Sequence, residues 1–234
     1  NAEGSGQLHV RLEGGAGDDG LALGAGGGIA MGEAGDDALF GGAGRDLLYG
    51  GTGTDYLTDR TGDDVSWGGS GRDLMSTGDG NDTAFGGDGN DQLEMRGGGH
   101  DLFYGGAGDD LLSSQEPSDG TMEGYGGSGN DQMANALEGA PRMVFYGGSG
   151  HDAFVGGDRD DLFYGGEGRD HFWDSTGTDS FVGGADSDAV ALVDPKGDAD
   201  HWIDFSTAEG DYIDIASVTD NQIAKDPFAE GFAR

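Results

Sequence analysis

The chain has 234 residues, of which 53 are glycine and only 34% are apolar, so it cannot fill the wide core of an ordinary globular enzyme and favours a thin, repetitive fold. Its 46 acidic and 11 basic residues give a net charge of -35. This charge argues against binding to nucleic acid or to an anionic membrane surface, because both need clustered Lys or Arg. A compact state of this charge needs bound cations, and the absence of cysteine excludes disulfides and Cys-ligated zinc.

Residues 1–13 are predicted to form a half-turn that leads into a solenoid. Leu8, Val10 and Leu12 alternate with other residues, as the side chains of a strand do. Leu12 also falls at the inward position of a half-turn that precedes the first repeat. We therefore expect this segment to lie in register with the first repeat.

Residues 14–191 repeat with a period of nine, in units such as GGAGRDLLY and GGDGNDQLE. Seventeen complete units are found, and position six is Asp in 16 of them, with Gly28 as the exception. Position eight is apolar in 16, with Ser66 as the exception. A surface of merely solvated aspartates would not keep this period.

Two stretches of 12 residues, 114–125 and 135–146, interrupt the period. Each is interpreted as one unit plus a three-residue bulge, at 114–116 and 135–137, which gives about 19 units in all. Met122 and Met143 then occupy the Asp position. The bulges have no assigned role.

The repeat predicts calcium sites. Glycines at positions one, two and four allow six residues to curl with their carbonyl oxygens inward, and the Asp adds a carboxylate. Calcium prefers six to eight oxygen ligands, which two neighbouring loops can supply. The candidate carboxylates are Asp19, Asp37, Asp46, Asp55, Asp64, Asp73, Asp82, Asp91, Asp101, Asp110, Asp131, Asp152, Asp161, Asp170, Asp179 and Asp188. The candidate carbonyls are those of Gly15, Gly17, Gly35, Gly42, Gly44, Gly51, Gly53, Gly69, Gly71, Gly87, Gly89, Gly106, Gly108, Gly127, Gly129, Gly148, Gly150, Gly157, Gly166 and Gly168.

These units resemble the RTX, or repeats-in-toxin, family, whose nonapeptide is GGxGxDxUx. The resemblance implies an all-β, right-handed parallel β-roll solenoid with two units, or 18 residues, per turn. It also implies calcium held between stacked turns, an extracellular location, and secretion in an unfolded state by a type I apparatus.

In a β-roll, alternate units place their loops on opposite edges. The continuous edge carries an unbroken series of Asp from Asp19 to Asp188, which predicts nine inter-turn sites. The interrupted edge begins without Asp at Gly28 and is broken again at Met122 and Met143, which predicts three sites and then one. The total is about 13 calcium ions, whose charge would offset most of the negative charge.

The last three residues of each unit are predicted to form a strand whose middle side chain points inward and whose outer two point outward. Leu39, Leu48 and Phe163 exemplify the inward core. Odd-numbered units present small or polar outward residues, such as Ser76, Glu94 and Ser113. Even-numbered units present an aromatic row, which is either a partner-binding surface or a stack of rings that support one another. The row is Tyr49, Trp67, Phe85, Tyr104, Tyr125, Tyr146 and Tyr164.

Residues 192–234 depart from the repeat and are interpreted as a C-terminal capping segment that covers the open end of the solenoid. Its apolar anchors are expected to be Trp202, Ile203, Phe205, Tyr212, Ile213 and Ile215. Spacing does not assign a metal role to the aspartates of this segment.

The sequence favours a non-enzymatic calcium-binding module of a secreted protein that folds when it meets extracellular calcium. No HExxH or GxSxG motif is present, and no apolar run is long enough to span a membrane. Two alternatives stay open. The first is a self-assembling cell-surface or fibre component that uses the aromatic row. The second is the accessory C-terminal domain of a secreted enzyme.

Overall fold

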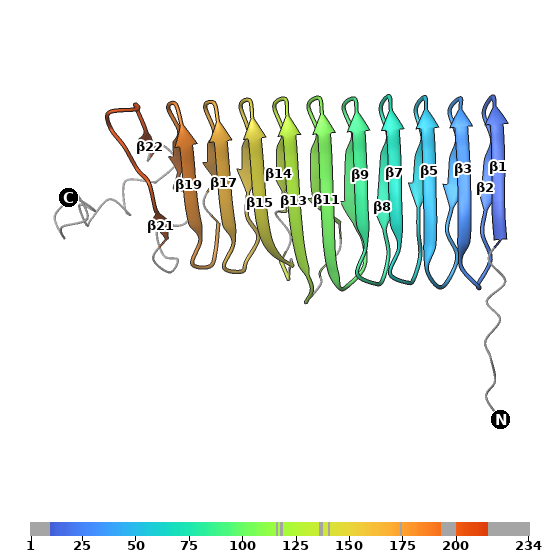
Figure 1. Ribbon diagram of the computed structural model, residues 1–234. Coiled ribbons are helices and arrows are strands. Elements are labelled where there is room, and N and C mark those ends of the chain that lie inside the picture. The colour runs from blue at the N-terminus through green and yellow to red at the C-terminus, as the bar shows by residue number, and fades with distance from the viewer. Residues whose placement is uncertain are drawn as a thin grey trace.

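The computed structural model describes residues 10–115, 117, 119–135, 138–139, 141–173, 175–192 and 200–214. These residues form two parallel sheets of 11 strands each, stacked as the two walls of a solenoid (Figure 1). The described ranges contain strands and no helix, so none of them could span a membrane as a helix. The predicted all-β parallel solenoid is confirmed.

The first sheet contains the odd-numbered strands, each paired in parallel with the next. In order they are β1 (Val10–Ala16), β3 (Gly28–Ala34), β5 (Asp46–Thr52), β7 (Val65–Ser70), β9 (Thr83–Asp88), β11 (His100–Ala107), β13 (Thr121–Ser128), β15 (Arg142–Ser149), β17 (Leu162–Glu167), β19 (Ser180–Ala185) and β21 (His201–Trp202). Most run on into the glycines of the following unit. The prediction of three-residue strands is therefore wrong for this sheet.

The second sheet contains the even-numbered strands, most of which have the predicted three residues. They are β2 (Gly20–Ala22), β4 (Ala38–Phe40), β6 (Tyr56–Thr58), β8 (Leu74–Thr77), β10 (Gln92–Met95), β12 (Leu111–Ser114), β14 (Gln132–Ala134), β16 (Ala153–Val155), β18 (His171–Trp173), β20 (Ala189–Ala191) and β22 (Tyr212–Asp214). β12 extends to Ser114, which lies in register with Met95 of β10.

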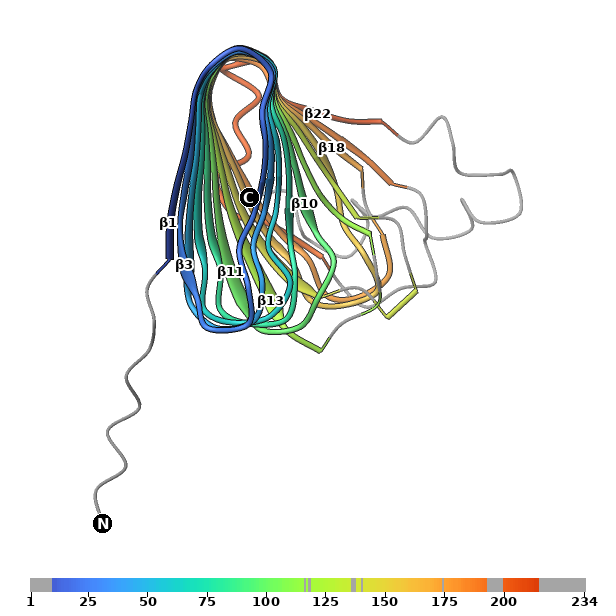
Figure 2. The same ribbon diagram turned by 90° about the vertical axis from the view of Figure 1, so that its right-hand side faces the viewer.

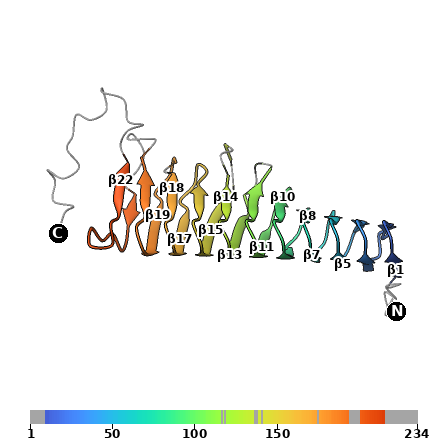
Figure 3. The ribbon, with the colours of Figure 1, turned by 90° about the horizontal axis from the view of Figure 1, so that it is seen from above.

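The two edges of the solenoid differ in shape. Figure 2 shows the continuous edge, where odd strands pass into even strands, as a sharp bend at the top. The interrupted edge, at the bottom, is broader. Seen from above, the solenoid turns follow one another in a single row from β1 to β22 (Figure 3). The register across the insertions keeps Asp101, Met122 and Met143 in line, as predicted.

A thin core runs between the sheets. The inward side chains at position eight are buried, as the repeat predicts, except that Leu21 in the first unit is partly buried. They change from aliphatic to aromatic along the chain, and stacked pairs such as Phe154 with Phe172 and Phe163 with Phe181 fill the C-terminal half. Leu12 packs against this core from β1, in its predicted position. The core is Leu39, Leu48, Leu57, Leu93, Phe103, Phe154, Phe163, Phe172 and Phe181, with further Leu, Met and Ala side chains between them.

One expectation about the second sheet is wrong. Ser76, Glu94 and Ser113 were expected to face solvent, but each is only 6% exposed. Long side chains from the following loop fold back over this part of the sheet. Arg96 donates to the Glu94 carboxylate at 2.6 Å, and Gln115 donates to the Ser113 hydroxyl at 3.4 Å.

The segment 200–214 adds one more strand to each sheet rather than a separate structure. β21 pairs with β19, and β22 pairs with β20. Of the expected anchors, Trp202 packs against the core, whereas Ile203 and Tyr212 are 65% and 49% exposed. Residues 193–199 and 215–234, including Ile215, lie outside the described residues.

Candidate metal sites

The continuous edge is built around a ladder of aspartates. The backbone N–H of each Asp donates to the Oδ1 of the Asp one solenoid turn later. The Asp37 N–H donates to Asp55 at 2.8 Å, and the Asp131 N–H donates to Asp152 at 2.8 Å. The ten hydrogen bonds run without a break from Asp19 to Asp211. One oxygen of each carboxylate is thus fixed by the backbone.

Between the two ends of this ladder, the other oxygen of each carboxylate, Oδ2, is buried and has no hydrogen-bond partner in the protein. A buried oxygen without a partner costs on the order of 1–3 kcal/mol, and more when it is charged. A regular series of such oxygens therefore indicates a ligand that supplies positive charge. They belong to Asp37, Asp55, Asp73, Asp91, Asp110, Asp131, Asp152, Asp170 and Asp188.

Backbone carbonyls converge on the same places. A methyl group built on Gly68, at position one of its unit, would collide with the Oδ2 of Asp73 and would lie 2.7 Å from the carbonyl oxygen of Gly86, one turn later. The carbonyls at positions two and four, those predicted as ligands, face the next loop: those of Gly51 and Gly53 lie directly over Gly69 and Gly71. Carboxylate and carbonyl oxygens therefore gather between adjacent loops, as a hard cation requires.

Two residues show that this loop shape belongs to the repeat rather than to glycine alone. Glu33 stands at position two and Asp186 at position four, where glycine is usual, and both have a φ of 80°. Positive φ is uncommon for residues with a side chain. The hydrogen bonds between loops thus impose this conformation even where the sequence does not favour it.

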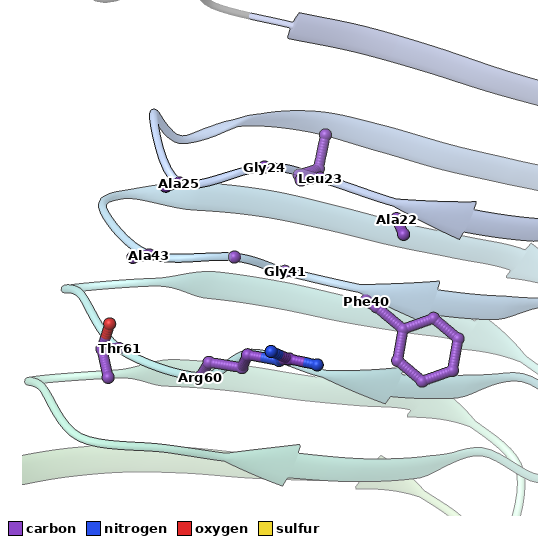
Figure 4. A pocket seen from close by; sticks show the side chains of 10 residues that line it. Ala22, Leu23, Gly24, Ala25, Phe40, Gly41, Ala43, Arg60 and Thr61 are labelled. Carbon is purple, nitrogen blue, oxygen red and sulfur yellow. The ribbon is translucent and has the colours of Figure 1, made fainter.

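The interrupted edge carries two shorter ladders of the same backbone hydrogen bonds, but there the Oδ2 of Asp101 accepts from Thr77 and that of Asp161 accepts from the backbone N–H of Gly157. The first links Asp46, Asp64, Asp82 and Asp101 through bonds of 2.6–3.0 Å. Met122 and Met143 then bury their side chains in the core. The second ladder links Asp161, Asp179 and Asp200. At the start of this edge Gly28 takes the Asp position, in register with Asp46. Leu23, Gly24 and Ala25 of the same loop line a hollow together with Phe40 and Arg60 (Figure 4).

The buried carboxylates hold protons strongly in the protein alone. Burial is the main cause that raises the pKa of Asp110, Asp131 and Asp170 to about 7, and neighbouring aspartates raise it further. The hydrogen bond from the preceding backbone N–H opposes this shift. At neutral pH the ladder is therefore a row of carboxyl groups of which a part is ionised. A divalent cation would offset their mutual repulsion.

Sequence reasoning missed three features of the sites. The carbonyls at position one were not among the predicted ligands. The signal for them is that position one is Gly in every unit of the continuous edge, which indicates that a side chain would not fit there. Asp200 and Asp211 extend the ladders, but lie 21 and 23 residues beyond their partners, so the period of nine does not reveal them. Asp59 also points inward, from position one of its unit.

The aromatic row on the first sheet is a continuous stack. Each of its rings lies against the next, with centroids 4.4–5.6 Å apart and planes within 12° of parallel, from Tyr49 to Tyr164. Such stacked pairs each contribute about 0.5–1.5 kcal/mol beyond the area they bury. The row therefore supports the first sheet along its length.

The fold and the ladders define a calcium-binding repeat module. The family model for the RTX calcium-binding nonapeptide repeat matches residues 24–57, 60–93, 97–114, 146–173 and 155–190, more than half of the chain. The chain belongs to the RTX family. The search of curated proteins found no match to the chain.

Proposed function

We propose that calcium ions fill the spaces between adjacent loops on both edges and that this binding folds the chain. The observation that carries the proposal is the ladder of buried, unpartnered carboxylate oxygens along the continuous edge. Each ion would take Oδ2 atoms and loop carbonyls, and about 13 ions would offset most of the charge of -35. Without them the aligned carboxylates repel one another, so binding and folding form one process.

We infer that the module belongs to a secreted protein and acts as a structural scaffold rather than as a catalyst. RTX proteins are typically secreted, and calcium is scarce inside cells and abundant outside them. Sites of extracellular modules bind calcium with dissociation constants of about 10⁻⁴ to 10⁻³ M, so the chain would stay unfolded in the cytosol and fold after export. Export by a type I apparatus is part of this proposal.

A calcium titration followed by far-UV circular dichroism tests the proposal. The chain should lack β-structure in chelator at neutral pH and gain it cooperatively at roughly 10⁻⁴ to 10⁻³ M calcium. Magnesium is the control, because it demands a smaller octahedral shell and dehydrates reluctantly. A β-sheet spectrum in chelator that calcium leaves unchanged would contradict the proposal.

Association through the aromatic row is a second candidate function. The row is half-buried by its own stacking, and the edges of its rings remain at the surface of the first sheet. Replacement of Tyr49, Trp67 and Tyr104 by Ser should abolish any calcium-dependent light scattering while leaving the circular dichroism titration in place. If the wild-type chain scatters no more than a monomer, the row serves only to stabilise the sheet.

A further inference from the structure

The interrupted edge contains an extra carboxylate that the repeat does not call for. Every unit of the continuous edge begins with Gly, whereas the unit 59–67 begins with Asp59. Asp59 is only 5% exposed, and its Oδ1 accepts a hydrogen bond of 2.6 Å from the backbone N–H of Gly78, one turn later. Its side chain therefore lies inside the solenoid and is held in place.

Asp59 meets two ladder carboxylates there. One oxygen from each of Asp59, Asp64 and Asp82 lies within 4.8 Å of the other two. Asp64 and Asp82 are each 1% exposed. Their Oδ1 atoms accept the ladder hydrogen bonds, and their Oδ2 atoms have no partner. Three carboxylates and two unpartnered oxygens thus share one buried space.

The surroundings of this space are more polar than the rest of the core. Ser66 is buried at the inward position that Leu48 and Ala84 occupy in the neighbouring strands. Thr77, at position one of the next loop on this edge, is buried and donates to Asp101 at 3.3 Å. The ion pairs found among the described residues, Arg11–Glu13 and Arg96–Glu94, do not involve the three carboxylates.

We propose that Asp59, Asp64 and Asp82 form a calcium site of higher affinity than the ladder sites, and that this site fills first. A ladder site draws its carboxylates from position six alone, whereas this one adds a third carboxylate from position one. Affinity for calcium rises with the number of charged ligands, and that number is greater here. The inference rests on the proposed calcium function and refines it for one place on the interrupted edge.

The test compares calcium binding by three full-length chains, using equilibrium dialysis with trace calcium. The variant Asp59→Asn removes the third charge and keeps an oxygen that can accept from Gly78. The variant Asp63→Asn is the matched control, since Asp63 is an exposed residue of the same loop. Asp59→Asn should weaken the tightest class of sites about tenfold or more, and Asp63→Asn should leave it within about twofold.

Equal binding by the two variants would overturn the inference. That result would mean that Asp59 is a neutral acid hydrogen-bonded to its neighbours, a role that the Asn amide can imitate. Both variants must reach the wild-type β-sheet signal in saturating calcium. If Asp59→Asn does not reach that signal, Asp59→Gly is used in its place, because it restores the glycine of the repeat. The same weakening of the tightest class of calcium sites is expected for Asp59→Gly. A wild-type chain that binds no calcium would instead refute the proposed function itself.

Discussion

The ladder aspartates of the continuous edge, from Asp37 to Asp188, use their two oxygens for different purposes. In Asp131, Oδ1 accepts from the backbone N–H of Asp110 at 2.8 Å, which fixes the distance between adjacent loops. Oδ2 is buried without a partner and is left for a cation. Because both oxygens belong to one rigid group, the spacing of the loops and the position of the metal ligand are set together.

The raised pKa values predict how the chain responds to pH in chelator. Asp131 and Asp170 have pKa values of about 7 in the folded protein, raised mainly by burial from an ordinary value of 3.8. Protonation of such groups favours the folded state, so their contribution is complete below pH 3.8 and is lost as the pH rises through 7. Without calcium, β-structure should therefore increase on acidification.

Circular dichroism in chelator between pH 8 and pH 4 measures this effect, with sedimentation to exclude aggregates. The change should fall between the ordinary carboxyl pKa of 3.8 and the folded-state values of about 6 for Asp152 and about 7 for Asp110. A spectrum that loses β-structure toward pH 5 would show that the buried carboxylates do not govern folding.

The loops and strands differ between the two edges for a steric reason. On the continuous edge, position one is always Gly and faces the Oδ2 of its own loop, which makes the bend tight. On the interrupted edge, position one holds larger residues such as Leu23, Asp59 and Thr77, and the bend is broader (Figure 2). The sheet that leads into the tight bend has the longer strands.

Substitution of Gly86 by Ala tests the crowding at position one. The added methyl group would collide with the Oδ2 of Asp91 and would lie 2.6 Å from the carbonyl oxygen of Gly105. We expect a loss of about 1–3 kcal/mol, seen as a higher calcium concentration at the midpoint of folding. Gly20→Ala is the control, because its methyl group has no atom within 4 Å. Equal midpoints for the two variants would argue against the packed arrangement of ligands.

Much of the fold could be predicted from the sequence because the repeat encodes it locally. Position six places the ladder Asp and position eight places the core residue, and Asp91 and Leu93 are both buried as the repeat predicts, without any long-range information. The register through the insertions was also predicted, since Met122 and Met143 keep their places in line with Asp101.

The features that sequence reasoning missed depend on contacts between turns. The length of the odd strands arises from hydrogen bonds between glycine-rich segments whose residues have no side chains to indicate a strand. Asp200 and Asp211 join the ladders through irregular spacings. The inward direction of Asp59 follows from its bond to Gly78, one turn away in space and 19 residues along the chain.

At the scale of the whole molecule, the net negative charge opposes the folded state that the repeat encodes. The chain places most of its ladder carboxylates in buried rows, and a net charge of -35 opposes any compact state. The hydrophobic core is a narrow layer of side chains between the two sheets, and we expect that it does not outweigh this repulsion by itself. Calcium between the loops would supply both a partner for the buried carboxylate oxygens and the positive charge that offsets the repulsion.

The most direct test measures bound calcium and β-structure in the same samples across one titration, with a calcium electrode and far-UV circular dichroism. The account predicts that both signals rise together and that saturation is reached near 13 ions per chain, with the tightest site filling first. Full β-structure before calcium binds, or saturated binding by a chain that stays unfolded, would contradict it.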